Sequence, residues 1–349
     1  MWKVNNQAVC YPFFYLLLTC LFYACGNDEL RERDSFFVKA NVQLSSGEYK
    51  EAIRYLNEAI RLDSTFAEAY NNRGIAYYEL GKYGQAVLDY TQAVNLREGF
   101  ADAFFNRANA YYQLEEFEKS LADLDSVEKY YPDSSYVYFT KGITLTETGE
   151  YEHAIRVMNQ AITLDSSNAE AYVNRGTVYY YQKNYQEAKQ DIDRALLLNA
   201  KEANAHNLLG LLLTEERDFP AALEAFEEAL RLSPFQPFFL NNRGYLYLQM
   251  DRLEEAREDI NQSIKLNPSN SYAYRNKAIY YLKIEEAEEA LRLLQQAADI
   301  SERTDKLDYY LGQAYFQLKQ NTKACSAWRQ AMTKGVAEAR AAVEEHCSK

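Results

Sequence analysis

Residues 67–100 read AEAYNNRGIAYYELGKYGQAVLDYTQAVNLREGF, and residues 169–202 read AEAYVNRGTVYYYQKNYQEAKQDIDRALLLNAKE. Both stretches are 34 residues long and carry small, aromatic and apolar residues at the same positions. The same pattern divides residues 33–338 into nine consecutive units without an insertion or deletion. We number the positions of each unit from 1 to 34 and call them slots. The units are 33–66, 67–100, 101–134, 135–168, 169–202, 203–236, 237–270, 271–304 and 305–338.

Slot 20 fixes the register, because it holds alanine in eight units and serine in one. Apolar residues three and four apart in both halves of each unit predict two amphipathic helices, and the glycine or polar residues between the halves favour a turn. One such hairpin cannot bury its apolar face alone, so neighbouring units are expected to stack. We therefore expect an all-α solenoid, one elongated array with a continuous core. The slot-20 residues are Ala52, Ala86, Ser120, Ala154, Ala188, Ala222, Ala256, Ala290 and Ala324.

The pattern resembles that of the tetratricopeptide (TPR) repeat family, whose W-x2-L-G-x2-Y…A-x3-F…P motif and period it matches over 306 of 349 residues. The resemblance implies a right-handed α-solenoid of nine TPR hairpins and a protein–protein interaction module that binds extended peptides in a concave groove. Residues 336–349 follow the turn at Lys334-Gly335 and are predicted to form a C-terminal capping helix and tail.

The N-terminal segment differs from the repeats. A short basic start at Lys3 precedes the apolar segment Ala8–Ala24, and charge returns at Asp28. This is the layout of an export signal. An uncleaved membrane anchor and simple secretion remain as alternatives, although the 17 apolar residues, interrupted by Pro12, are short for a bilayer span.

The end of this segment, Phe22–Gly26, resembles a bacterial lipobox. The resemblance implies a signal peptide over residues 1–24, a lipid on Cys25 and a short linker over residues 25–32. Cys20 is a competing lipidation site. The residues after the cysteine resemble those of outer-membrane and Bacteroidetes surface lipoproteins. They imply an extracytoplasmic protein that is lipid-anchored to the cell envelope, on the periplasmic or surface face of the outer membrane.

The remaining cysteines, Cys325 and Cys347, both lie at the C-terminal end. Each is about a helix length from the turn that separates them, so the two face each other if their helices are antiparallel. In an oxidising compartment this predicts a disulfide, with two reduced cysteines as the alternative.

Composition excludes several classes of function. The chain has 38 Lys+Arg against 51 Asp+Glu, a formal net charge of −13, and no basic run interleaved with aromatic residues. We therefore expect no nucleic-acid partner, and acidic peptides are poor ligands. The three histidines never adopt metal-ligand spacing, and no phosphate-binding loop, nucleophile elbow or dinucleotide-binding glycine motif occurs. We expect no metal, no cofactor and no enzymatic activity.

The resemblance also implies which residues line the groove. Asparagine recurs in slot 6, as in the asparagine ladder of the TPR region of O-linked N-acetylglucosamine transferase. An amide offers a donor and an acceptor together and so matches a peptide unit whatever its side chain. The alternative is that asparagine serves folding alone in this slot. The expected peptide-binding residues are Asn72, Asn106, Asn174, Asn242, Asn276, Tyr78, Tyr112, Tyr180, Tyr181, Tyr245, Phe105 and Phe139.

A second pattern links slots 7 and 23. Where slot 7 is arginine, slot 23 is aspartate, and where slot 7 is leucine, slot 23 is alanine. This predicts an ion pair between the two helices of one hairpin. Where slot 7 is Lys141 or Lys277, slot 23 is apolar, and we expect the lysine to reach solvent. The predicted pairs are Arg73–Asp89, Arg107–Asp123, Arg175–Asp191 and Arg243–Asp259.

These features favour a membrane-tethered TPR adaptor that binds extended peptide or protein segments in its groove, in envelope assembly or secretion. Two alternatives remain. One is a structural scaffold of an envelope complex that uses its convex or end surfaces. The other is a binder of glycan or peptidoglycan.

Overall fold

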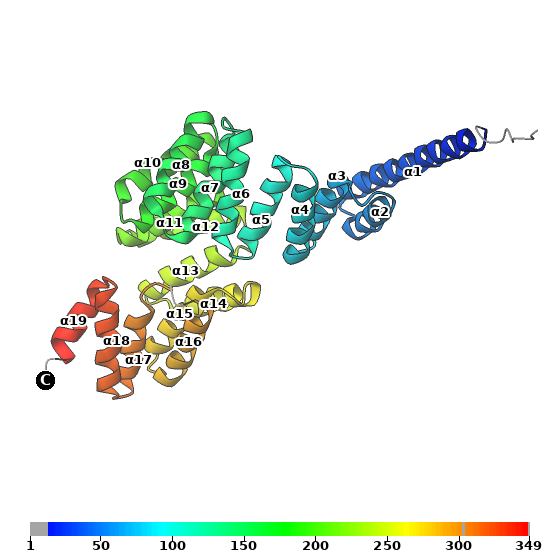
Figure 1. Cartoon of the computed structure of the whole chain (residues 1–349). Helices are drawn as coiled ribbons and strands as arrows, with labels where there is room; N and C mark the ends of the chain where they lie inside the picture. Colours follow the sequence, from blue (N-terminus) through cyan, green and yellow to red (C-terminus); the bar gives the residue numbers. More distant parts are fainter. Residues whose placement is uncertain (1–12, 302–303, 348–349) are drawn as a thin grey trace, which may run out of the picture. The chain divides into compact units, whose positions relative to one another are not determined.

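The computed structural model describes residues 13–301 and 304–347, with side chains from residue 28 onward. Within these ranges the chain forms nineteen α-helices and no strand (Figure 1). The all-α solenoid of helical hairpins is thus confirmed. The chain divides into two compact units, one ending at Ser166 and the other beginning at Ser167. The expected continuation of one core through all nine repeats stays a prediction.

The first unit contains the first four repeats. In each repeat, helix A occupies the first slots and helix B follows a short turn. The helices are α1 Phe13–Ser45, α2 Tyr49–Leu62, α3 Ala67–Glu79, α4 Tyr83–Leu96, α5 Ala101–Gln113, α6 Phe117–Tyr130, α7 Ser135–Thr148 and α8 Tyr151–Leu164.

The second unit contains the last five repeats and a terminal helix. Its helices are α9 Ala169–Tyr181, α10 Tyr185–Leu198, α11 Ala203–Glu215, α12 Phe219–Leu232, α13 Pro237–Gln249, α14 Leu253–Leu266, α15 Ser271–Lys283, α16 Ala287–Ile300, α17 Leu307–Gln317, α18 Asn321–Thr333 and α19 Ala337–His346.

One turn joins helix A to helix B in every repeat. The residue in slot 15 has a positive φ in all nine repeats, whether it is a glycine such as Gly81 (+70°) or a charged residue such as Glu285 (+64°). The amide of slot 16 donates to the carbonyl of slot 11 each time, as from Lys82 to Tyr77 (2.8 Å). This is the Schellman arrangement, which satisfies the last carbonyls of helix A and reverses the chain.

The small residue of slot 8 lets helix B approach helix A. In five repeats glycine in slot 8 faces a large side chain in slot 24. A Cβ on Gly312 would lie 2.2 Å from the Trp328 ring, and one on Gly74 would lie 2.6 Å from Tyr90. Trp328 and Tyr90 are each about 1% exposed. In these five hairpins a large side chain of helix B therefore packs directly on the glycine backbone of helix A.

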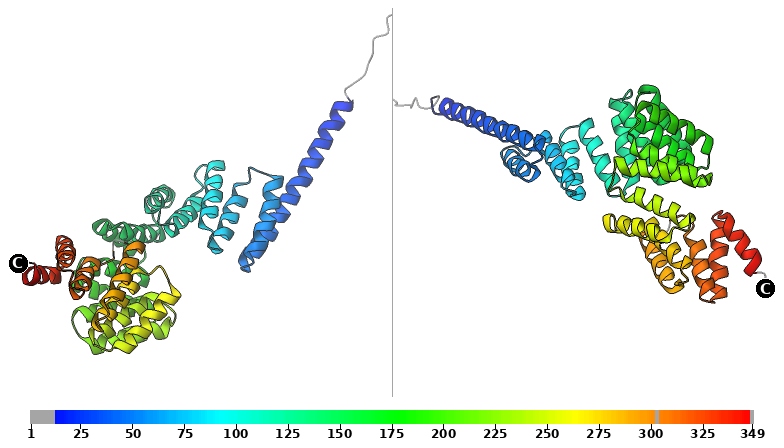
Figure 2. Two further views of the ribbon diagram at one scale, coloured as in Figure 1. Left: turned by 90° about the horizontal axis from the view of Figure 1, so that it is seen from below. Right: turned by 180° about the vertical axis from the view of Figure 1, so that it is seen from behind.

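The long helix α1 extends past its partner α2 toward the N-terminus (Figure 2). Residues 25–32, predicted as a linker, lie inside this helix, because no glycine turn or proline separates them from the first repeat. The side chain of Cys25 and residues 1–12 of the predicted signal peptide lie outside the described residues. Among the helices described, none is both long enough and apolar enough to cross a membrane.

All four predicted arginine–aspartate pairs form within their hairpins. In the third repeat, Arg107 donates through Nε and one terminal nitrogen to the two Asp123 oxygens, both at 2.7 Å. Its other terminal nitrogen donates to Thr91 of the preceding repeat (3.1 Å). Asp123 is 5% exposed. Each pair therefore joins the helices of one hairpin, and this one also links neighbouring hairpins.

The expectation for lysine in slot 7 was wrong at Lys141. Its side chain is 13% exposed, and its Nζ lies 2.6 Å from Asp125 and 2.7 Å from Glu128 of the preceding helix B. Burial opposes the ammonium charge, but the two carboxylates outweigh it and raise the pKa of Lys141. Comparing slots within one repeat missed these partners, because they lie in the repeat before.

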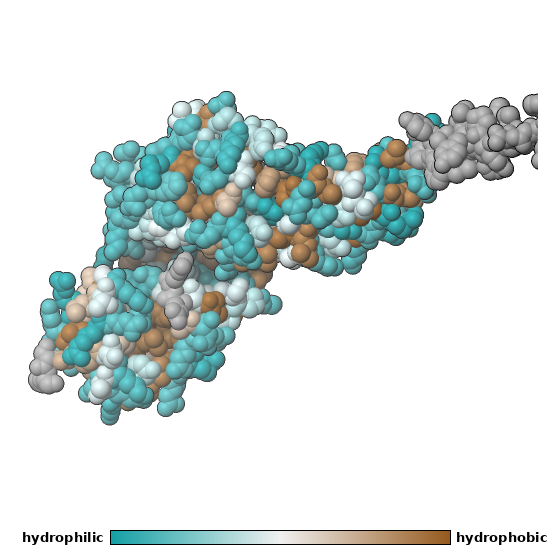
Figure 3. Space-filling view, viewed as in Figure 1, coloured by the Kyte–Doolittle hydropathy of each residue, from teal (hydrophilic) through white to brown (hydrophobic). Residues whose placement is uncertain are grey.

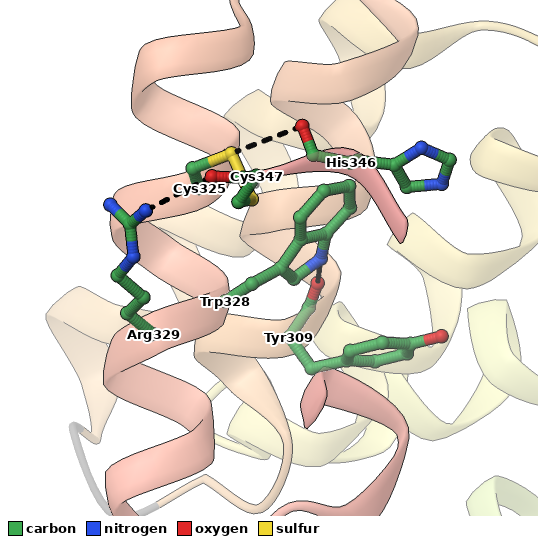
Figure 4. Close-up of a disulfide and its surroundings, with 6 residues drawn as sticks. All are labelled: Tyr309, Cys325, Trp328, Arg329, His346 and Cys347. Atoms are coloured by element: carbon green, nitrogen blue, oxygen red, sulfur yellow. Dashed lines mark hydrogen bonds between the residues drawn. A yellow bond between two sulfur atoms is a disulfide. The ribbon is translucent and has the colours of Figure 1, made fainter. Parts of the chain in front are cut away.

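A disulfide joins Cys325 on α18 to Cys347 after α19, with the Cα atoms 5.6 Å apart (Figure 4). Beside it, the Trp328 indole donates to the Tyr309 carbonyl (3.2 Å), and the His346 ring lies 5.6 Å from the indole. The terminal helix α19 thus covers the last hairpin and is covalently held there.

Candidate functional site

Slots 2, 5, 6, 9, 12 and 13 share one side of helix A, because they recur every three or four residues. We call this surface the helix-A face and treat it separately in each unit. In the first unit α3 contacts both α1 and α5, and in the second unit successive A helices are in contact from α9 to α17. The face of each unit is thus lined by consecutive A helices.

In the first unit a relay of four amides runs across three repeats. Asn106 donates to Asn71 (3.0 Å), Asn71 donates to Asn72 (3.2 Å), and Asn72 donates to Asn41 (2.7 Å). Every donor therefore points toward the N-terminal end of the relay. Among the described residues, no donor reaches the Asn106 side-chain oxygen. The relay ends on this open acceptor.

In the second unit the amides also bond to one another. Asn242 donates to Asn207 (3.0 Å), and Asn276 donates to Asn241 (2.8 Å). The Asn276 oxygen accepts from Arg275, and the Asn276 side chain is fully buried. We expected this residue to contact a ligand, but its burial removes it from the surface. Its amide instead forms a hydrogen bond that joins α15 to α13.

Asn174 behaves differently from the other predicted amides. Its side chain donates to the carbonyl of Glu170, one turn earlier on α9 (2.8 Å), and it is half-buried. Among the described residues, its side chain makes no hydrogen bond to a neighbouring repeat. The slot-6 ladder is thus a set of inter-repeat ties in both units, with Asn174 as the exception.

The slot-12 tyrosines pack on the ring in slot 17 of the same hairpin. The ring centroids of Tyr78 and Tyr83 are 5.2 Å apart, and those of Tyr180 and Tyr185 are 5.8 Å apart. Tyr112 packs in the same way on Phe117 (5.6 Å). These tyrosines are half-buried, so part of each side chain stays accessible and the rest packs within its hairpin.

An aromatic cluster stands on the face of the first unit. The ring of Tyr136, at the start of α7, has its centroid 5.2 Å from that of Phe105 on α5 and 6.3 Å from that of Phe139, with an angle of 28° between the Tyr136 and Phe139 rings. Tyr136 is 58% exposed, whereas Phe139 is 7% exposed. Two predicted residues, Phe105 and Phe139, therefore support a third ring that sequence reasoning missed. The sequence did contain a signal for Tyr136, because slot 2 is acidic or polar in six of the other repeats and aromatic here.

On the helix-A face of the second unit, the tyrosines are more deeply buried than the Tyr136 ring of the first unit. Burial raises the pKa of Tyr180, with Glu215 and Tyr245 adding to the effect. Burial likewise raises the pKa of Tyr310, which hydrogen-bonds to Tyr245. The predicted residues Tyr180 and Tyr245 thus belong to a network of phenols, whereas the predicted Tyr181 is 52% exposed.

The two faces carry different charge. In the first unit the face has five carboxylates and no lysine or arginine, and in the second it has two carboxylates and three cations. The carboxylates of the first unit are Asp34, Glu68, Glu79, Asp102 and Glu147. The charged residues of the second are Glu170, Glu215, Arg275, Lys283 and Lys306.

Family comparisons agree with the hairpin geometry. Models of the TPR repeat match residues 40–81, 76–115 and 142–183, and further tetratricopeptide repeat models match residues 173–237, 237–270, 102–134 and 307–334. Together they cover well over half of the chain. The chain belongs to the tetratricopeptide repeat family. A search of curated protein sequences found no match to this TPR protein.

Solved structures show the same fold. The Cut9–Hcn1 hetero-tetramer of APC/C aligns with a TM-score of 0.59 and 17% identity, over 80% of this TPR chain and 55% of that one. The pilF protein of Pseudomonas aeruginosa aligns with a TM-score of 0.51 and 18% identity, over 60% of this chain and 95% of that one. At such identities these likenesses show the TPR fold alone.

No group of three or more His, Cys, Asp or Glu side chains in the described part of this TPR protein could hold a metal ion. Apolar side chains interrupt the polar surface in several places (Figure 3). The connection between α12 and α13 exposes apolar side chains as well, because Phe235 is 74% exposed and Phe238 is 49% exposed. The prolines Pro234 and Pro237 flank Phe235 and restrict the backbone that presents it.

Proposed function

We propose that this TPR protein is a non-catalytic adaptor that binds extended polypeptide on the helix-A face of its first unit. The observation that carries the proposal is the combination of the solvent-exposed Tyr136 cluster with an amide relay that ends on the open Asn106 oxygen. An amide oxygen accepts a backbone N–H whatever the side chain, and an aromatic ring supplies contact area. The family supports a protein or peptide as the partner.

We further propose that Cys25 carries a lipid that tethers the adaptor to the bacterial envelope, outside the cytoplasm, with a role in envelope assembly or secretion. The lipobox-like sequence supports this, and so does the disulfide, which is stable in an oxidising compartment. Cys25→Ala is expected to move the protein from the membrane to the soluble fraction or to block its processing. Unchanged membrane partition of Cys25→Ala, with release by Cys20→Ala, would assign the lipid to Cys20.

Binding is tested with an unfolded polypeptide, for example reduced and alkylated lysozyme, labelled for fluorescence anisotropy. Asn109, half-buried in slot 9 of α5, is replaced by tryptophan to obstruct the face. The matched control is Leu88→Ser on α4, where the side chain is 72% exposed on helix B. We expect Asn109→Trp to weaken binding and Leu88→Ser to leave it unchanged, with both variants helical. The reverse pattern would contradict groove binding.

The reverse pattern would favour a structural scaffold that uses its outer surfaces. The exposed Phe235, which lies between α12 and α13 and outside the slots of the helix-A face, is the observation that supports this alternative. Phe235→Ser would then abolish association with a folded partner, whereas the adaptor proposal expects it to leave binding of the unfolded polypeptide unchanged.

A further inference from the structure

We infer that the first unit selects extended segments in which lysine or arginine stands next to an aromatic side chain. This inference rests on the proposed function and specifies the chemistry of its ligand. It follows from three features of the helix-A face: its charge, its exposed ring and its contrast with the same face of the second unit.

The first feature is charge complementarity. The face of the first unit has five carboxylates in its slots and no cation. Two of them pair with arginines outside those slots, Asp34 with Arg33 and Glu68 with Arg97, both at 2.6 Å. Asp102 is exposed and has no cation partner among the described ion pairs. The face thus keeps a negative potential that attracts a cationic segment and repels an acidic one.

The placement of the carboxylates matters as much as their number. Asp102 is in slot 2, at one end of helix A, and Glu79 and Glu147 are in slot 13, at the other end. The amide relay and the rings of Phe105 and Phe139 lie in slots 5, 6 and 9, between these two ends, and the Tyr136 ring is in slot 2, at the same end as Asp102. An extended segment lying along the amides therefore passes carboxylates on both sides, whichever way its basic side chains point.

The second feature is the Tyr136 ring. Slot 2 is the first turn of helix A, where a carboxylate is favoured by the helix dipole, and five repeats have Asp or Glu or Asn there. Tyr136 cannot make this interaction with the helix dipole, and its large ring is 58% exposed to solvent. The rings of Phe105 and Phe139 pack against the Tyr136 ring. A supported, exposed ring is suited to stack with an arginine, a lysine or another ring.

The third feature is the second unit, which serves as an internal comparison. It has the same slots, but they hold three cations and two carboxylates. Two of these cations pair with carboxylates outside the slots, Lys283 with Asp251 (3.1 Å) and Lys306 with Glu338 (2.7 Å). The second unit has two slot-2 rings, Phe238 and Tyr272, and Tyr272 already has the Arg275 guanidinium 5.2 Å from its centroid. Arg275 is 8% exposed and also donates to the Asp305 carbonyl (2.9 Å). The cation that a ligand would bring to Tyr136 is thus supplied by the fold at Tyr272.

The test uses three short labelled peptides and the detergent-solubilised full chain. The first peptide alternates lysine with tyrosine, the second has glutamate in place of lysine, and the third has alanine in place of tyrosine. By anisotropy we expect the lysine–tyrosine peptide to bind roughly tenfold more tightly than either of the others at low salt. Added salt should reduce its advantage over the glutamate peptide.

Two pairs of variants locate the site. Asp102→Asn and Tyr136→Ala should each weaken binding of the lysine–tyrosine peptide by about two- to fivefold. The controls Glu170→Gln and Tyr272→Ala change the same slot in the second unit and should have no effect. A larger effect of the controls would overturn the assignment to the first unit.

The outcomes separate the inference from the function on which it rests. Equal binding of the lysine and glutamate peptides, sensitive to Asn109→Trp, would overturn the charge preference and leave groove binding in place. Binding of none of the peptides, together with no binding of reduced and alkylated lysozyme, would overturn both.

Discussion

At the scale of single residues, the repeats fill slots 7 and 23 either with an arginine–aspartate ion pair or with leucine and alanine. The Arg107–Asp123 pair is largely buried, with side chains 14% and 7% exposed. Asp123→Ala leaves a buried guanidinium without its carboxylate and should lower the free energy of unfolding by about 1–3 kcal/mol. Adding Arg107→Leu reproduces the leucine and alanine of the sixth repeat and should recover part of this loss. Denaturant titration measures both, and equal losses would mean that the two residues are not coupled.

Ser120 occupies the slot that is alanine in the other eight repeats. It is fully buried, and its hydroxyl has no hydrogen-bond partner among the described residues. Ser120→Ala should therefore raise the free energy of unfolding, by about 1–2 kcal/mol. The control is Ser263→Ala, because the Ser263 hydroxyl donates to the Pro237 carbonyl at 2.7 Å. That variant should be destabilised, and the same sign of change in both would contradict the explanation.

The partners of single polar residues could be predicted only in part. The arginine–aspartate pairs were visible because both slots vary together within one repeat. Asn276 and Lys141 were placed wrongly because their partners lie one repeat earlier, on Asn241 and on Asp125. A slot fixes the side of the helix on which a residue lies, but the neighbouring repeat decides whether that side is covered.

At the scale of the elements, the turn between helices A and B is the same in every repeat, although six of the nine slot-15 residues are not glycine. A left-handed backbone strains any residue with a Cβ. Glu285→Gly should therefore stabilise the protein by up to about 1 kcal/mol, reduced by the greater chain entropy of glycine when unfolded. Gly81→Ala, at φ +70°, should destabilise it. Thermal unfolding by circular dichroism measures both, and stabilisation by Gly81→Ala would be inconsistent with this explanation.

The helices themselves were predictable because a 34-residue period sets the length of each hairpin. Helix B is Tyr83–Leu96 in the second repeat and Tyr185–Leu198 in the fifth, the same slots in both. The exposed ring of Tyr136 was missed because the predicted site residues were taken from slots that many repeats share. Its signal was a departure from the pattern, an aromatic residue where most repeats are polar.

At the scale of the whole molecule, the C-terminal end is held covalently. The disulfide closes a loop with a sequence separation of 22 residues and should stabilise the last helices by about 3 kcal/mol in the chain-entropy model. Reduction, or Cys347→Ser, should speed hydrogen exchange in α18 and α19 and leave α3–α6 unchanged. Unchanged exchange in α18 after reduction would show that packing on Trp328 alone holds this end.

The division into two units was not predictable from the period, which continues through the boundary at Ser166 and Ser167 without a change of length. The charge of the two helix-A faces, by contrast, can be read from the slots once the hairpins are known. This contrast in charge, with the exposed ring of Tyr136, underlies the assignment of binding to the first unit.

Site-specific photo-crosslinking tests that assignment most directly. A benzophenone amino acid is placed at position 109, on the helix-A face of α5, or at position 88, on the outer side of α4. Each protein is irradiated with reduced and alkylated lysozyme, and the adducts are mapped by mass spectrometry. We predict adducts from position 109 that the lysine–tyrosine peptide competes away, and few from position 88. Adducts from position 88, with none from position 109, would contradict the binding of extended polypeptide on the helix-A face.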